Sequence, residues 1–174
     1  MLFLRLLILA VLLLVFVQDI RNRSVYWVLF PVLAVLLVLL HSLPHHLLAD
    51  IWQPVSINIV FLLFQFLIIS VYFSIKNRRW INITDGLLGW GDILLLLSIA
   101  FYLSALNFLL FYIVSLTISL LIWLFWQVIS EEKNKQIPLA GFQALIFTVF
   151  LAGDWWFKYF DLTDDARWLH LIMK

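Results

Sequence analysis

Two aspartates stand at the ends of apolar segments, where an ionisable side chain is costly unless it has a purpose or a partner. Asp19 closes the first apolar run in the stretch VQDIRNR, and Asp92 opens a later run in GLLGWGDILLL. Two carboxylates held close together can divide the work of hydrolysis, because one activates water as a base while the other protonates the departing amine. The pair therefore predicts catalysis by Asp19 and Asp92, with no metal or cofactor.

The ends of helices give the two carboxylates a physical reason to differ. A carboxylate at a helix N-terminus is stabilised as an anion, whereas one at a C-terminus is not. We expect Asp92 at the start of a helix and Asp19 at the end of one, so we predict Asp92 as the base and Asp19 as the proton carrier. The structural alternatives are a capping anion for Asp92 and a turn residue paired with Arg21 or Arg23 for Asp19.

The elements that must position these residues follow from composition. Of the 174 residues, 66% are hydrophobic and only 12% are charged, against about 25% charged in an ordinary soluble domain. The apolar segments continue from end to end, which predicts one all-α, polytopic transmembrane domain over residues 1–174. The formal net charge of +1 does not indicate a nucleic-acid partner, and a chain without cysteine has no disulfide, thiolate zinc site or cysteine nucleophile.

Segment lengths predict about six transmembrane helices, since crossing roughly 30 Å of hydrocarbon takes about 20 apolar residues. The first segment is expected to be a retained helix rather than a signal peptide, because Arg5 interrupts its apolar run and no cleavage site follows. A turn is expected from Ser104 to Asn107, within the long uncharged stretch of residues 93–130. The expected spans are residues 2–17, 25–40, 54–75, 93–104, 108–130 and 137–153.

The distribution of basic residues predicts the orientation, because Lys and Arg accumulate in cytoplasmic loops. The second and fourth turns contain no Lys or Arg. The first turn contains Arg21 and Arg23, the third contains Lys76, Arg78 and Arg79, and the fifth contains Lys133 and Lys135. The N-terminus is therefore expected outside, with Asp19 and Asp92 at the cytoplasmic boundary.

The residues around the two aspartates resemble a known family. Gly89-Trp90-Gly91-Asp92, entering an apolar helix, resembles the GxGD motif of the prepilin peptidases, the aspartic intramembrane enzymes that trim type IV pilin-like precursors. Asp19 followed by Arg21 is similar to the D-x-R segment at the family's first aspartate. The segment from Ile137 through Pro138 to Ala140 resembles the one before the family's last helix. The chain resembles the short form, which lacks the cysteine-rich methylation domain.

This resemblance implies a membrane aspartic endopeptidase that cleaves the leader of prepilin-like precursors at the cytoplasmic face of the inner membrane. Its partners would be that substrate and the lipid bilayer. The chain departs from the family pattern after the motif, where Ile93 and Leu94 stand in place of a small apolar residue and Lys. It also departs after the first aspartate, where Ser24, Val25 and Tyr26 replace Ile-Pro-Asn.

Two other functions stay open from the sequence. The departures favour an inactive family member that acts as a membrane assembly partner, and membrane carboxylates also suit a proton or ion carrier.

Family substrates have basic leaders, so Asp85, Glu131 and Glu132 are candidates for docking such a leader, with ordinary loop charge as the alternative. A loose histidine cluster lacks the spacing of metal ligands and comprises His41, His45 and His46.

Overall fold

The computed structural model covers residues 1–174, and the parts of it that can be described are residues 1–42, 48–77, 89–129, 138–157 and 161–165. These parts contain six helices and no strand, which confirms the predicted all-α class. The helices are α1 (Leu2–Asn22), α2 (Leu29–Ser42), α3 (Leu48–Asn77), α4 (Trp90–Ala100), α5 (Ala105–Ile129) and α6 (Leu139–Phe157).

Four of the described helices, α1, α3, α5 and α6, are long and apolar enough to cross a membrane. The other two are shorter apolar helices, of 14 residues in α2 and 11 residues in α4. The described residues therefore support a membrane protein with four helices of spanning length. The count of six crossings stays a prediction.

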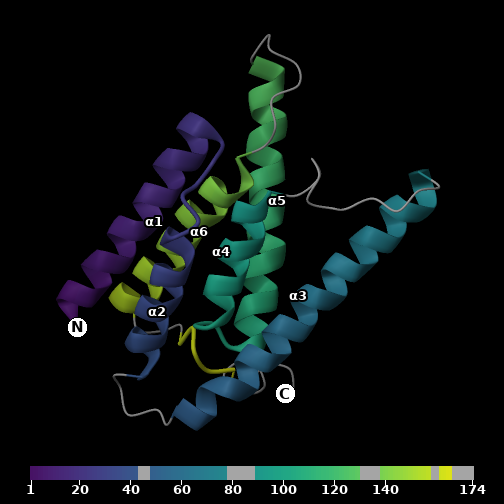
Figure 1. Cartoon of the computed structure of the whole chain (residues 1–174). Helices are drawn as coiled ribbons and strands as arrows, with labels where there is room; N and C mark the ends of the chain where they lie inside the picture. The colour runs from purple at the N-terminus through teal and green to yellow at the C-terminus, as the bar shows by residue number, and fades with distance from the viewer. Residues whose placement is uncertain (43–47, 78–88, 130–137, 158–160, 166–174) are drawn as a thin grey trace.

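Five helices form the body of the molecule, and α3 slopes away from it (Figure 1). The helix α6 packs against α1, α4 and α5, while α2 packs against α1 and α4. The interior is filled by large apolar side chains, among which Phe30, Phe108, Phe111 and Phe147 are at most 1% exposed. The first half of α3 joins this core through Phe61, whose ring meets the edges of Phe108 and Tyr112.

Polar side chains fix the positions of the helices that carry the two aspartates. The hydroxyl of Ser98 on α4 lies 2.9 Å from the carbonyl oxygen of Phe30 on α2. The backbone N–H of Tyr26 donates to Gln18 Oε1 at 3.1 Å and so holds the connection from α1 to α2. Arg23 ends α1 in a left-handed conformation with φ 51°, and its N–H donates to the carbonyl oxygen of Asp19.

The turn between α4 and α5 lies at residues 101–104, earlier than the predicted turn from Ser104 to Asn107. Ser104 immediately precedes α5, and its carbonyl accepts the N–H of Phe108 at 2.8 Å. The carboxylate of Asp165 accepts the Ser104 hydroxyl at 2.6 Å and the N–H of Leu106 at 3.2 Å. A carboxylate from the far end of the sequence thus caps α5, which the local sequence does not reveal.

We predict that Asn58 joins α3 to the bundle. Its side chain is 1% exposed, and Nδ2 donates to the carbonyl oxygens of Ala100 at 3.1 Å and Leu103 at 2.8 Å. Asn58→Leu removes both hydrogen bonds and should lower the free energy of unfolding by about 1–2 kcal/mol, measured by denaturant titration in detergent micelles. The control is Ser56→Ala on the exposed face of α3, and an equal loss in both variants would contradict this role.

Candidate active site

Asp19 lies in the last turn of α1 and turns its carboxylate into the protein. The residue is 8% exposed although its neighbours Ile20 and Arg21 are exposed. Its Oδ2 accepts a hydrogen bond of 2.6 Å from the backbone N–H of Gly141, in the first turn of α6. Hydrogen bonds to ionised groups are shorter and stronger than neutral ones, so α6 directly stabilises the Asp19 carboxylate.

Asp92 lies in the first turn of α4, as predicted. Its Oδ2 accepts the backbone N–H of Gly89 at 3.1 Å, which is the contact expected of an acidic residue at the third position of a helix. The carboxylate also accepts a hydrogen bond from the backbone of Ala140. Helix capping therefore accounts for the contact of Asp92 with Gly89. It does not account for the hydrogen bond from Ala140 at the start of α6.

The two carboxylates meet at the start of α6, on neighbouring backbone amides. The first N–H groups of a helix have no partner within it, and the helix dipole makes this end attractive to anions. Pro138 immediately precedes α6, and its carbonyl accepts the N–H of Phe142 at 3.2 Å. The N–H groups of Ala140 and Gly141 are thereby left free for the carboxylates of Asp92 and Asp19.

Glycines permit this approach at two places. A Cβ added to Gly141 would lie 3.2 Å from both Cβ and Oδ2 of Asp19, and 3.4 Å from the carbonyl oxygen of Phe16. A Cβ on Gly89 would lie 3.1 Å from Oδ2 of Asp92. At Gly91 the added Cβ would make ordinary contacts, at 3.6 Å from Phe30 and 3.8 Å from Ala140. The first glycine of the GxGD motif is therefore the one that the carboxylate requires.

The charges of the two aspartates act on each other. Burial and then the neighbouring charge of Asp19 raise the pKa of Asp92 to about 7, against the opposing hydrogen bonds from Gly89 and Ala140. A pair of this kind suits acid–base chemistry near neutral pH, because one group can hold a proton that the other lacks.

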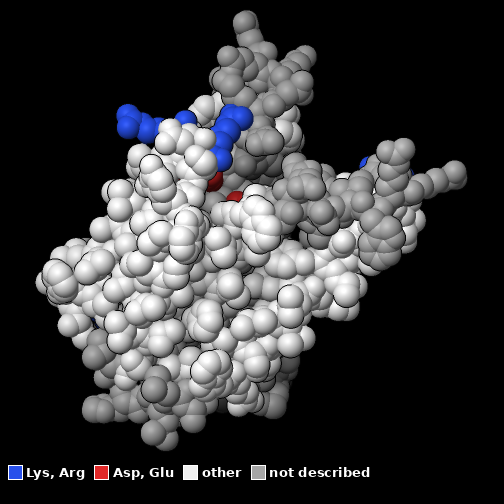
Figure 2. Space-filling model, viewed as in Figure 1, with Lys and Arg blue, Asp and Glu red and all other residues white. Residues whose placement is uncertain are grey.

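The site opens at the surface at the end of the molecule where α1 ends. Figure 2 shows acidic atoms in a hollow there, beneath basic side chains. The described basic residues that end α1 are Arg21 and Arg23, both exposed. Asp92 is partly exposed and Asp19 almost fully buried, so a molecule entering from this side meets Asp92 first.

Several predicted site residues lie outside the described parts of the chain, namely Asp85, Glu131, Glu132, His45 and His46. His41 is described and lies in the last turn of α2. It is 7% exposed, and its ring packs edge-to-face with that of Tyr102. Within the described residues, no three His, Cys, Asp or Glu side chains gather as metal ligands would.

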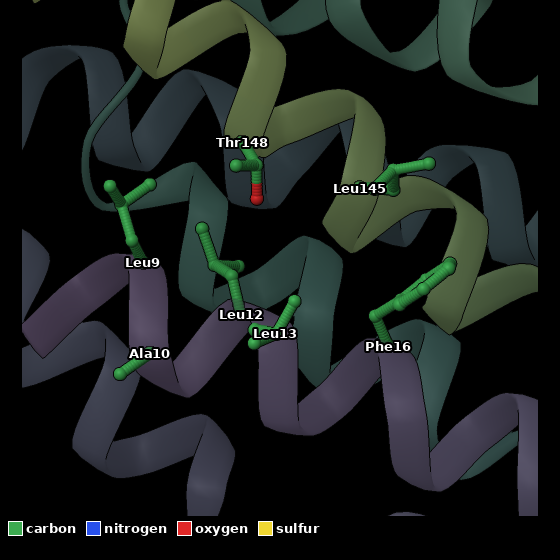
Figure 3. A pocket seen from close by; sticks show the side chains of 7 residues that line it. All are labelled: Leu9, Ala10, Leu12, Leu13, Phe16, Leu145 and Thr148. Carbon is green, nitrogen blue, oxygen red and sulfur yellow. The ribbon is translucent and has the colours of Figure 1, made fainter. Parts of the chain in front are cut away.

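An apolar groove with a volume of about 240 Å³ lies between α1 and α6, starting one turn from Asp19 (Figure 3). The hydroxyl of Thr148 donates to the carbonyl oxygen of Ala144 within its own helix. The groove therefore presents almost only hydrocarbon and belongs to the apolar surface of the bundle rather than to the acidic site. Its lining comprises Leu9, Ala10, Leu12, Leu13, Phe16, Leu145 and Thr148.

Reasoning from the sequence missed Gly141, which is central to the site. The available signal was Pro138, because proline favours the first positions of helices and marks where free amides follow. The sequence also placed only Asp92 at a helix N-terminus, whereas Asp19 reaches the N-terminus of α6 with a side chain from the C-terminal turn of α1. A position at a helix N-terminus therefore does not by itself distinguish the two carboxylates, since both contact the N-terminus of α6.

Comparison with known proteins gives no relative. No protein-family model, no curated protein and no solved structure matches the chain.

Gly141 and Gly153, both in α6, provide a matched test of the site's packing. Gly141→Ala should lower the free energy of unfolding by about 1–3 kcal/mol, because its Cβ would lie only 3.2 Å from Cβ and Oδ2 of Asp19 and would press on this side chain. Gly153→Ala meets nothing within 4 Å and should raise the free energy of unfolding by about 0.5–1 kcal/mol, since alanine is the better helix former. Unfolding in detergent micelles measures both, and a stabilising Gly141→Ala would contradict the close approach of Asp19.

Proposed function

We propose that this protein is a membrane aspartic endopeptidase that cleaves the leader of a prepilin-like precursor at the cytoplasmic face of the membrane. The observation that carries the proposal is the convergence of Asp19 and Asp92 on the adjacent amides of Ala140 and Gly141. Two buried or partly buried carboxylates that influence each other's charge are the arrangement that aspartic hydrolysis requires. The resemblance to the GxGD motif supports the same reaction.

The reaction needs one carboxylate as base and the other as acid. Asp19 accepts the shorter hydrogen bond, 2.6 Å from the N–H of Gly141 against 3.1 Å from the N–H of Gly89 to Asp92, and such a bond favours the ionised form. Asp92 has a pKa raised to about 7 and so retains its proton near neutrality. These observations favour Asp19 as the base and Asp92 as the acid, the reverse of the assignment made from helix ends alone.

In the proposed step, a water oxygen adds to the carbonyl carbon of the scissile peptide bond while Asp19 accepts a proton from the water. The C–N bond then breaks, and Asp92 donates its proton to the departing nitrogen. The products are a new carboxyl group on the leader and a new amino terminus on the remaining chain. Proton exchange with solvent restores the starting protonation of the two aspartates.

The direct test is cleavage of a substrate in reconstituted vesicles. The substrates are single-span proteins with a basic leader ahead of an apolar segment. Their cleavage rates are measured with the wild-type protein and with the Asp19→Asn and Asp92→Asn variants. Each variant should lose at least about 100-fold in cleavage rate, since each removes one proton-transfer group.

Asp161→Asn is the matched control, because Asp161 is exposed and lies beyond α6, near the start of α5. Its cleavage rate should equal that of wild type. Cleavage that persists in Asp19→Asn or Asp92→Asn would refute the paired mechanism. A folded wild type that cleaves none of the substrates would instead favour the assembly partner.

The pH dependence tests the assignment of acid and base. Because the pKa of Asp92 is about 7 and the proposed acid must carry a proton, kcat/KM should fall as pH rises through about 7. Carboxyl NMR of labelled aspartate should show the same titration, and the corresponding resonance should be missing in Asp92→Asn. A rate that rises through this range would assign Asp92 as the base.

A further inference from the structure

The interface between α5 and α6 contains two buried polar side chains that the two aspartates do not use. Ser119 and Gln143 are both 0% exposed. Among the residues that the structure describes, Ser119 Oγ and both Nε2 and Oε1 of Gln143 find no hydrogen-bond partner. Burying an amide or hydroxyl without a partner is energetically costly, so these groups indicate a small polar ligand.

The helical register places these two side chains at the interface. The ring of Phe111 on α5 contacts Phe147 and Phe150 on α6, with centroids 5.5 and 5.6 Å apart. Gln143 precedes Phe147 by four residues and Phe150 by seven, so all three lie on the face of α6 that meets α5. On α5, Ser119 follows Phe111 by eight residues and lies on the same buried face.

The positions of Ser119 and Gln143 along the axis of the bundle follow from the directions of α5 and α6. The N–H of Ser104 donates to the carbonyl oxygen of Leu162 at 3.1 Å, so α5 begins beside the end of α6 and the two run antiparallel (Figure 1). Gln143 lies about 6 Å from Phe147 toward the start of α6, and Ser119 about 12 Å from Phe111 in the same direction. Ser119 therefore reaches the level of the first turn of α6.

That first turn contains Ala140, whose backbone binds the carboxylate of Asp92. Ser119 and Gln143 thus lie within about one helical turn of the level at which the backbone of Ala140 binds Asp92. A buried water in proteins makes about three hydrogen bonds to polar groups that otherwise lack partners. A hydroxyl and a carboxamide together offer donors and acceptors enough to hold one.

We propose that Ser119 and Gln143 bind water between α5 and α6 and hold it within reach of the aspartate pair, as a reserve of the water that hydrolysis consumes. The supply of water to the reaction rests on the proposed function, whereas the binding of water between the helices does not. Gln143 is a positioning residue in this scheme.

The natural chain has no cysteine, so a single introduced thiol gives an isolated infrared S–H band. In Ser119→Cys, transfer to D₂O should convert S–H to S–D at least about tenfold faster than in Ser98→Cys, because exchange requires water at the thiol. Ser98 is the matched control, a buried serine whose hydroxyl lies beside two carbonyl oxygens. Adding Gln143→Leu to Ser119→Cys should slow the exchange.

Activity gives the second measurement, with folding verified by the melting temperature. Gln143→Leu should lower kcat at least about tenfold with little change in KM, since it displaces water rather than substrate. Gln143→Asn keeps a carboxamide and should retain more of kcat. Exchange in Ser119→Cys as slow as in Ser98→Cys would overturn water binding, and an unchanged kcat in Gln143→Leu would overturn its supply to the aspartates. The exchange measurement stands even if the protein cleaves no peptide.

Discussion

The arrangement of this protein depends on the first turn of α6, where two carboxyl groups that repel each other when both are ionised are held on neighbouring amides. Two such groups repel each other in apolar surroundings unless donors offset their charge. The N–H groups of Ala140 and Gly141 supply those donors, at the end of a helix where amides have no internal partner. The contacts of Gln18 and Ser98 then hold the connection of α1 to α2 and the packing of α2 against α4.

The two ends of the bundle differ in how their polar groups are satisfied. At the end where α5 begins, the side chains of Asn107 and Asp165 bond to backbone and hydroxyl groups of the α5 cap and of residues 161–165. At the other end, the interior contains the aspartate pair and, nearby, the amide of Gln143, which has no partner among the described residues. Hydrogen-bond networks in which every polar group has a partner make a fold rigid, whereas buried polar groups without a partner are available to a ligand.

The sequence was sufficient to predict the all-α class and to place Asp19 and Asp92 at the ends of helices, because apolar run lengths and the acids at their ends are local signals. The turn between α4 and α5 was placed too late, since it depends on Asp165, about 60 residues farther along. Gly141 was missed for the same reason: its importance comes from a side chain of α1, which only tertiary packing brings to it. The proposed assignment of acid and base likewise depends on neighbours in space.

The bond between Asp19 and Gly141 joins residues 122 positions apart, and this separation has a consequence for the order of synthesis. A ribosome completes α1 and α4 long before it makes α6, so neither carboxylate has its amide partner while the chain is growing. Nascent and prematurely terminated chains therefore contain both aspartates without the geometry that pairs them. Addition of α6 is therefore the step that brings the two carboxyl groups onto adjacent backbone amides.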